Sequence, residues 1–170
     1  MGRRLGITAF ACALVLTAAA CEGTWTKTAQ PSPVRAVHAA LLHTAKVLLT
    51  AGSGNDPVQF AAGTFKTAIY DPTTGSMRSD IATPYDLFCS GHAFLPDGRL
   101  LVAGGTTAYG NSTTDVPYKG DKRVRIFDPV TETYRTAPSM AIGRWYPVGC
   151  EVGQGRLTPG WVRSPRLSSW

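Results

Sequence analysis

The sequence has little charge, few cysteines and few histidines. Only 16% of its 170 residues are charged, four are cysteine and three are histidine, whereas 18 are glycine and 12 are proline. Low charge with abundant glycine and proline argues against a coiled coil or a helical bundle. A hydrophobic fraction of 44% is too high for a disordered tail. The composition therefore predicts a turn-rich, all-β domain.

An export signal is predicted at the N-terminus. Arg3 and Arg4 precede a nearly uncharged apolar run from Leu5 to Leu16, and small residues follow directly before Cys21. The run is too short to span a bilayer as a helix of the mature protein. We therefore predict a helical signal peptide over residues 1–21 that is removed on export.

Cleavage of this signal has two interpretations. Ala18–Ala20 suits an ordinary signal peptidase, which would release a secreted protein. The same residues before Cys21 resemble a bacterial lipobox, in which Cys21 is lipidated and anchors the chain to the membrane, although the leucine usual three residues before that cysteine is missing. Either way the mature chain is expected to be secreted or in the bacterial cell envelope, where cysteines can oxidise.

The formal charge of +6 does not indicate nucleic-acid binding. Five of the 17 basic residues lie in the signal or near the C-terminus: Arg3, Arg4, Arg156, Arg163 and Arg166. Residues 22–155 then carry 12 basic and 11 acidic groups, a net charge of about +1. We expect no nucleic-acid partner.

Beyond residue 36 the chain repeats itself. The segment His38–Gly52 aligns with His92–Gly105 at an offset of 54 at the histidines, and Ile69–Gly75 recurs as Ile126–Glu132 at an offset of 57. A repeat of about 50 residues is the spacing of kelch units in β-propellers. Residues 22–36, which contain two prolines and little periodicity, are interpreted as a linker or lead-in strand.

Local patterns agree with propeller blades. Val47–Leu49 and Leu100–Ala103 are short apolar runs before glycine, typical of buried strands that end where backbones crowd together. Pro96–Gly98 predicts a tight hairpin turn. Residues 66–77 are expected to form strand, turn and strand, and residues 107–123 a long polar loop between the inner and outer strands of the second unit.

These patterns predict an incomplete kelch-like β-propeller over residues 37–157, with about two blades and a broken third. A generic antiparallel sandwich is the alternative. Gly155–Leu157 repeats the register of Gly98–Leu100, but residues 158–170 contain two prolines, two arginines and no strand alternation. We interpret residues 158–170 as an aberrant tail from truncation or a frameshift, with a genuine extension as the alternative.

Two segments carry candidate chemistry: Asp86–His92 (DLFCSGH) and Met140–Pro147 (MAIGRWYP). The order FCxGH, LPDGRLLVAGG and MxxxRWYP, after an upstream HxxLL…KVLLxxGSGN, resembles the copper radical oxidases, the family of galactose oxidase and glyoxal oxidase. The RWYP sequence favours the glyoxal oxidase-like branch. The resemblance covers roughly residues 34–152.

The resemblance implies a thioether between the sulfur of Cys89 and the ring of Tyr146, with Tyr146 as a copper ligand and radical carrier. Oxidising an alcohol or aldehyde hydrate takes two electrons, whereas the Cu(II)/Cu(I) couple supplies one. The implied substrates are small aldehydes, alcohols or carbohydrates, oxidised by O₂ with release of H₂O₂. The family's two histidine ligands and axial tyrosine come from later in the chain, so this N-terminal fragment is expected to be inactive alone.

Cys89 and Tyr146 also have simpler interpretations. Cys89 could form a disulfide with Cys150, or it could be a small buried apolar residue. Tyr146 could be a core aromatic whose hydroxyl is hydrogen-bonded. The alternative function is a non-catalytic kelch-repeat envelope protein that binds carbohydrate or protein through its loops.

The neighbouring residues leave further choices open. His92 shares its repeat register with His38, which favours a structural role over metal ligation. Trp145 is not expected to shield a radical on Tyr146, because neighbours in a strand point to opposite faces. Arg144 either positions a substrate oxygen or is a surface charge.

Overall fold

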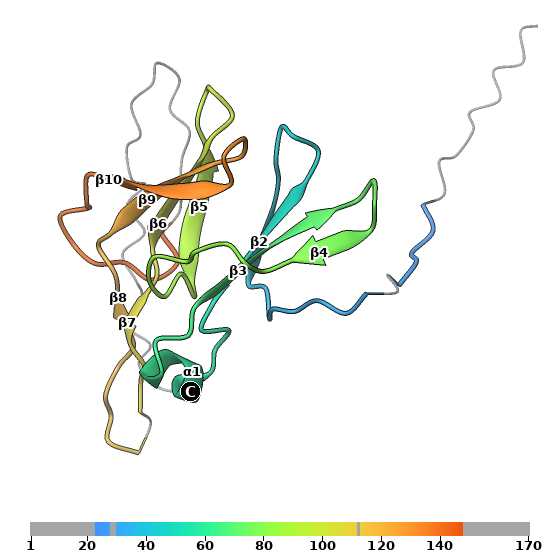
Figure 1. Cartoon of the computed structure of the whole chain (residues 1–170). Helices are drawn as coiled ribbons and strands as arrows, with labels where there is room; N and C mark the ends of the chain where they lie inside the picture. Colours follow the sequence, from blue (N-terminus) through green and yellow to red (C-terminus); the bar gives the residue numbers. More distant parts are fainter. Residues whose placement is uncertain (1–22, 28–29, 112, 148–170) are drawn as a thin grey trace, which may run out of the picture.

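The structure is a computed structural model that describes residues 23–27, 30–111 and 113–147 (Figure 1). The predicted signal peptide with Cys21, the cysteine at 150, the start of any third blade and the tail 158–170 lie outside these residues. Within the described part, no helix is both long and apolar enough to cross a membrane.

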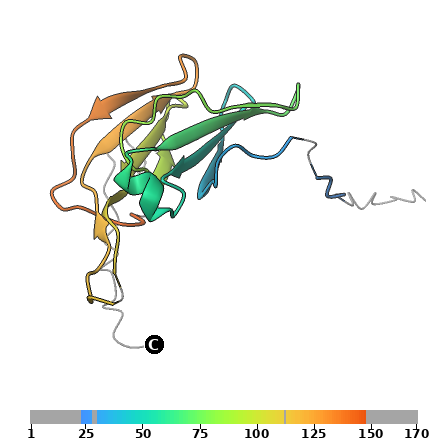
Figure 2. The same cartoon turned by 60° about the horizontal axis from the view of Figure 1, so that its bottom comes forward.

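The chain forms two four-stranded antiparallel sheets that lie side by side (Figures 1 and 2). The strand orders are β1-β2-β3-β4 and β10-β9-β6-β5. The strands of the first sheet are β1 (His38–Leu41), β2 (Val47–Gly52), β3 (Lys66–Asp71) and β4 (Ser76–Arg78). Those of the second are β5 (Ser90–Phe94), β6 (Leu100–Gly104), β9 (Val124–Asp128) and β10 (Thr133–Ala137). The all-β, partial-propeller prediction is confirmed.

The inner hairpins of the two sheets have the same turn. The amide of Leu42 donates to the carbonyl of Lys46 at 2.8 Å, and that of Leu95 donates to Arg99 at 2.8 Å. The third turn residue has positive φ in both hairpins, 61° at Ala45 and 83° at Gly98. Glycine adopts this conformation without steric cost, whereas alanine is strained by it. The hairpin predicted at Pro96–Gly98 is therefore confirmed.

The outer turns, from β3 to β4 and from β9 to β10, are also equivalent. The side chain of Asp71 accepts the amide of Thr73 at 2.9 Å, and Asp128 accepts that of Val130 at 2.9 Å. An aspartate that binds the amide two residues ahead stabilises such a turn locally. The repeat seen in the sequence thus corresponds to the same hydrogen-bonded aspartate turn in both sheets.

The main core lies between the two sheets. Leu48 and Ile69 of the first sheet pack with Leu100, Val102 and Phe127 of the second, and all five side chains are at most 2% exposed. Burying each stabilises the fold by about 1.5–3 kcal/mol. The two blades therefore depend on each other for their core.

The opposite face of the first sheet is covered by the lead-in segment. Val34 packs there against Ala51 of β2 and Ala68 of β3, and all three are buried. The described residues before β1 contain no helix or strand. This segment therefore runs over the sheet without adding a strand to it.

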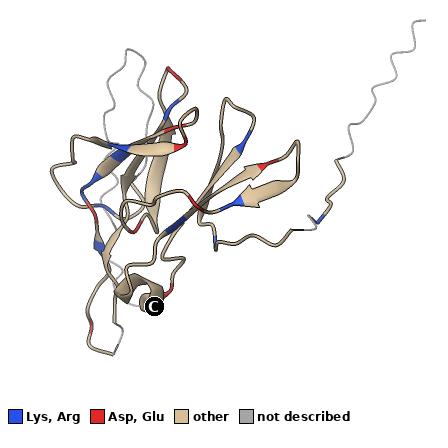
Figure 3. Ribbon diagram, viewed as in Figure 1, with Lys and Arg blue, Asp and Glu red and all other residues tan. Residues whose placement is uncertain are grey.

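An ion-pair cluster joins the blades at the outer turns. Glu132, in the β9–β10 turn, pairs with Lys46 at 2.8 Å and with Arg78 of β4. Glu132 has a φ of 54°, and the equivalent position of the first blade is Gly75, which also has positive φ. Elsewhere the charges are mixed in sign over both sheets (Figure 3).

Two small elements project from the end of the sheets opposite the hairpin turns (Figure 1). Helix α1 (Pro57–Ala61) begins at Asp56, whose side chain accepts the amides of Val58 and Gln59. Strands β7 (Thr106–Ala108) and β8 (Lys119–Gly120) form a two-stranded sheet. The expectation of a simple loop over residues 107–123 is thus wrong in part, because these strands are too short to show alternation in the sequence.

Candidate functional site

Cys89 and Tyr146, which are 57 positions apart, meet at the start of β5. Cys89 precedes Ser90, the first residue of that strand, and is 1% exposed. The amide of Tyr146 donates to the carbonyl of Cys89 at 2.7 Å. Their side chains are hydrogen-bonded as well. The thiol therefore lies within hydrogen-bonding reach of the phenol hydroxyl.

The same contact changes the acidity of both groups. Burial raises the pKa of the Cys89 thiol to about 11, against a smaller opposite effect of the hydrogen bond to Tyr146. That hydrogen bond, together with burial, raises the pKa of the Tyr146 hydroxyl to about 12. Both groups are therefore neutral at pH 7, and Cys89 is a free thiol in the structure.

Both residues have strained backbones. The φ angle is 60° at Cys89 and 48° at Tyr146, and few other non-glycine residues in the described part have positive φ. Such a conformation costs on the order of 1–3 kcal/mol and persists where the surroundings enforce it, often at functional sites. Here both strained residues belong to the same hydrogen-bonded pair.

Glycine allows the segment with Tyr146 to lie against the sheet. A Cβ on Gly91 of β5 would lie 1.9 Å from the carbonyl oxygen of Pro147, and one on Gly120 of β8 would lie 2.2 Å from the carbonyl carbon of Arg144. No real Cβ makes such contacts. Residues 144–147 can therefore lie this close to β5 and β8 only because both positions are glycine.

Trp145 lies closer to Tyr146 than the sequence predicted. Residues 145 and 146 form a bend, and the two rings are 5.4 Å apart between centroids. The expectation that they point to opposite faces of a strand is wrong, because they are not in a strand. The indole Nε1 of Trp145 donates to Thr106 Oγ1 at 3.0 Å, and the indole stacks on Tyr118 at 4.6 Å.

A buried carboxylate lies on the same side of the sheets. Asp86 is 1% exposed and accepts hydrogen bonds from the amide and hydroxyl of Ser53 and from the amide of Phe88, at 2.7–3.0 Å. Ser53 Oγ also lies 2.6 Å from the hydroxyl of Tyr109. In the sequence, Asp86 and Ser53 are marked only as members of the motifs DLFCSGH and GSGN, and no motif marks Tyr109.

The two repeat-related histidines touch. The rings of His38 and His92 are 4.4 Å apart in an edge-to-face arrangement, and His38 lies 6.0 Å from the ring of Tyr146. The Nε2 atoms of both histidines are buried without a hydrogen-bond partner. Burial lowers the pKa of His38, and it lowers that of His92 to about 3 with a further contribution from His38. Both imidazoles are therefore neutral at pH 7.

Acidification is expected to destabilise the chain through His92. The unfolded chain takes up a proton at this imidazole below about pH 6.5, whereas the folded chain, with a pKa of about 3, keeps it neutral. The stabilisation is thus full above pH 6.5 and is lost as the pH falls from there toward 3. At pH 4 the loss is about 3 kcal/mol.

Urea unfolding at pH 7 and pH 4 tests this expectation. His92→Phe keeps a ring but cannot titrate, so its midpoint should fall less on acidification than that of the wild type. His43→Gln is the matched control, since His43 is exposed in the β1–β2 turn. Equal acid dependence of the wild type and His92→Phe would contradict the assignment.

One residue of this site, Tyr146, has a side chain whose chemistry suits copper. A phenol oxygen such as that of Tyr146 suits Cu(II), which prefers oxygen and nitrogen donors. Among the residues that the structure describes, no group of three or more histidine, cysteine, aspartate or glutamate side chains could hold a metal ion. Within this part of the chain, Tyr146 therefore fits copper as one ligand of a larger set.

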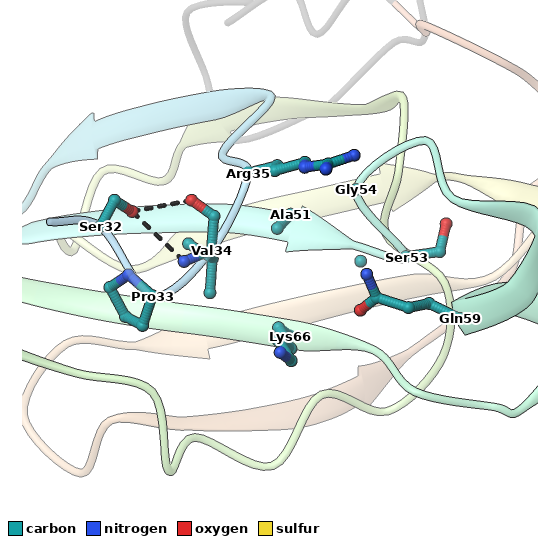
Figure 4. Close-up of a pocket in the computed structure, with 10 residues that line it drawn as sticks. Ser32, Pro33, Val34, Arg35, Ala51, Ser53, Gly54, Gln59 and Lys66 are labelled. Carbon is teal, nitrogen blue, oxygen red and sulfur yellow. Dashed lines mark hydrogen bonds between the residues drawn. The ribbon is translucent and has the colours of Figure 1, made fainter.

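A separate pocket of about 260 Å³ opens between the lead-in segment and the ends of β2 and β3 (Figure 4). Arg35, Lys66 and Ser53 are among its lining residues. Ser32 Oγ donates to the carbonyl of Val34 at 2.7 Å beside it. The lining is polar and basic, and Ser53 connects this pocket with Asp86.

Comparisons with known proteins agree with this fold. The chain is 26% identical over 138 residues to galactose oxidase of Gibberella zeae, a match that covers 79% of this chain. It spans about 18% of the length of these curated relatives. No protein-family model matches.

A solved structure shows the same architecture. A fungal alcohol oxidase of the AA5 family, determined in complex with copper, superposes with a TM-score of 0.53 and 24% identity over 74% of this chain and 25% of that chain. The chain is therefore related in sequence to galactose oxidase and has a copper radical oxidase-like fold.

Proposed function

We propose that this chain is the N-terminal part of a secreted copper radical oxidase and carries the cross-linked cysteine–tyrosine half of its centre. The observation that supports the proposal most directly is the contact of the Cys89 sulfur with the Tyr146 phenol. Oxidation of aldehydes or primary alcohols by O₂, with release of H₂O₂, would need further metal ligands. The chain alone is therefore expected to be inactive.

Each residue of the pair has a defined task. Tyr146 Oη would bind copper, and the thioether sulfur of Cys89 would donate electron density to the ring and lower its potential. Copper, when bound, would supply one-electron oxidation through its Cu(II)/Cu(I) couple. The backbone bond from Tyr146 to Cys89 fixes the backbone of Tyr146 against the start of β5, and the ring of Trp145 lies 5.4 Å from the Tyr146 ring between centroids.

The remaining parts of the proposal concern the ends of the chain. Residues 1–21 act as the export signal, residues 22–36 as the linker, and residues 37–157 as part of a kelch-like propeller followed by the aberrant tail 158–170. Cys21 is the lipid attachment site if the signal is a lipobox. The protein is then either secreted or a bacterial cell-envelope lipoprotein.

Peptide mass spectrometry tests the cross-link. After incubation of the chain with copper and O₂, we expect the peptides that contain Cys89 and Tyr146 to be joined, with a mass two hydrogens below their sum. Bond formation removes the thiol hydrogen and one ring hydrogen, and dioxygen takes up the two electrons and two protons.

Cys89→Ser should abolish the joined species, whereas the matched variant Cys150→Ser should retain it. Unmodified peptides after copper treatment would favour the alternative, a non-catalytic kelch-repeat protein that binds carbohydrate or protein. A disulfide between positions 89 and 150 would refute the radical centre.

A further inference from the structure

The aromatic residues around Tyr146 form a continuous series that ends at a hydrogen-bonded tyrosine. From Tyr146 the ring centroids are 5.4 Å from Trp145, then 4.6 Å on to Tyr118 and 5.3 Å on to Tyr109. Trp145 and Tyr118 are stacked, with 13° between their planes. Tryptophan and tyrosine are the side chains most easily oxidised by one electron, apart from thiolates.

Tyr109 differs from the other members of the series in its hydrogen bonds. Ser53 Oγ donates to Asp86 Oδ2 at 2.7 Å, and this carboxylate can only accept. The single hydroxyl hydrogen of Ser53 is thus committed to Asp86. In the 2.6 Å contact between Ser53 and Tyr109, the tyrosine hydroxyl must therefore be the donor.

The direction of these bonds makes a proton path. Oxidation of a tyrosine is unfavourable unless its proton leaves at the same time. Asp86 is 1% exposed and receives its three hydrogen bonds from neutral donors, so this buried carboxylate is the last acceptor of the path. Ser53 links it to the phenol without a movement of heavy atoms.

We propose that Tyr109, with Ser53 and Asp86, is a second redox-active tyrosine site, which drains an oxidising equivalent from Tyr146 through Trp145 and Tyr118. The oxidant in this inference is a phenoxyl radical at Tyr146, and in that respect the inference rests on the proposed function. It assigns to the β7–β8 hairpin, which carries Tyr109 and Tyr118 in its loop, a role in protecting the centre when no substrate is bound.

The transfer is balanced. One electron passes from Tyr109 to the phenoxyl radical at Tyr146, which becomes a phenolate. The phenol proton of Tyr109 moves to Ser53 Oγ while the hydroxyl proton of Ser53 moves to Asp86 Oδ2. The products are a neutral tyrosyl radical at Tyr109 and a protonated Asp86.

A photochemical experiment tests the site without copper or thioether. The full chain is illuminated with a ruthenium tris-bipyridine oxidant and a sacrificial electron acceptor, then frozen for electron paramagnetic resonance. We expect a persistent tyrosyl signal in the wild type, most of which is lost in Tyr109→Phe. Tyr70→Phe, a change on β3 outside the aromatic series, is the matched control and should leave the signal unchanged.

Two further variants separate the proton path from the electron path. Ser53→Ala retains every tyrosine but removes the proton acceptor of Tyr109, so it should lower the yield of the tyrosyl radical. In the wild type we expect radical formation to be slower in D₂O than in H₂O, and this difference should be absent in Ser53→Ala. Trp145→Phe should lower the yield at Tyr109 while it preserves a ring at that position. Circular dichroism verifies folding of each variant.

The outcomes distinguish this inference from the proposed function. Equal signals in Tyr109→Phe and Tyr70→Phe, or an unchanged isotope effect in Ser53→Ala, would overturn the tyrosine site. An unchanged yield of the Tyr109 radical in Trp145→Phe would overturn the transfer through Trp145. Because the oxidant is external, none of these results depends on whether Cys89 and Tyr146 become cross-linked.

Discussion

Phe127→Ala is expected to lower the free energy of unfolding by about 3–5 kcal/mol. Phe127 is fully buried on β9 and belongs to the core between the two blades. Its ring also meets Tyr134 of β10 edge to face, with centroids 5.0 Å apart. Truncation to alanine removes these contacts and leaves a cavity that a rigid pair of sheets cannot fill. A decrease of this size is a large fraction of the free energy of unfolding of an ordinary domain.

Urea unfolding followed by tryptophan fluorescence measures this loss. Val130→Ala is the matched control because Val130, in the next turn, is 74% exposed; its effect should stay within about 0.5 kcal/mol. If both variants unfold at the same urea concentration, the two blades do not share a packed core.

Gly91→Ala is expected to prevent the cross-link between Cys89 and Tyr146. The new Cβ would lie 1.9 Å from the carbonyl oxygen and 2.9 Å from the carbonyl carbon of Pro147. Backbone atoms cannot move aside as a flexible side chain can, so residues 144–147 must shift away from β5. Tyr146 then loses its 2.7 Å bond to Cys89, and the sulfur no longer lies beside the phenol.

The yield of joined peptides after copper treatment measures this effect, with unfolding as a second measurement. Gly75→Ala is the control, since a Cβ there meets no atom within 4 Å although φ is 69°. It should cost about 1–2 kcal/mol through its backbone conformation alone and leave the cross-link intact. A normal yield in Gly91→Ala would show that contact with β5 does not position Tyr146.

Much of the fold could be predicted because it is encoded locally. The Pro96–Gly98 turn and the turns at Asp71 and Asp128 depend on residues two to four positions apart. The apolar runs of β2 and β6 are short strands buried in the core between the blades. Such signals survive in a single sequence, and their recurrence at a fixed spacing indicated the blades.

The site was predicted only in part, because its other contacts join distant segments. Asp86 meets Ser53 across 33 residues, and Ser53 meets Tyr109 across 56. No local pattern marks such pairs. Trp145 was misplaced for a different reason: its orientation follows from a bend set by close backbone contacts at Gly91 and Gly120, and a strand period does not apply there.

By itself, the sequence determined that the chain is a repeat of short antiparallel strands and that Cys89 and Tyr146 are the residues to examine. Only the tertiary structure decided that these two side chains touch, that His38 and His92 pack ring to ring, and that the Tyr109 hydroxyl lies 2.6 Å from Ser53 Oγ, which donates to Asp86. The physical reason is that turns and strands arise from neighbours in the chain. A reactive pair arises instead from the packing of the segment after β10 against the start of β5, which brings together residues that are far apart in sequence.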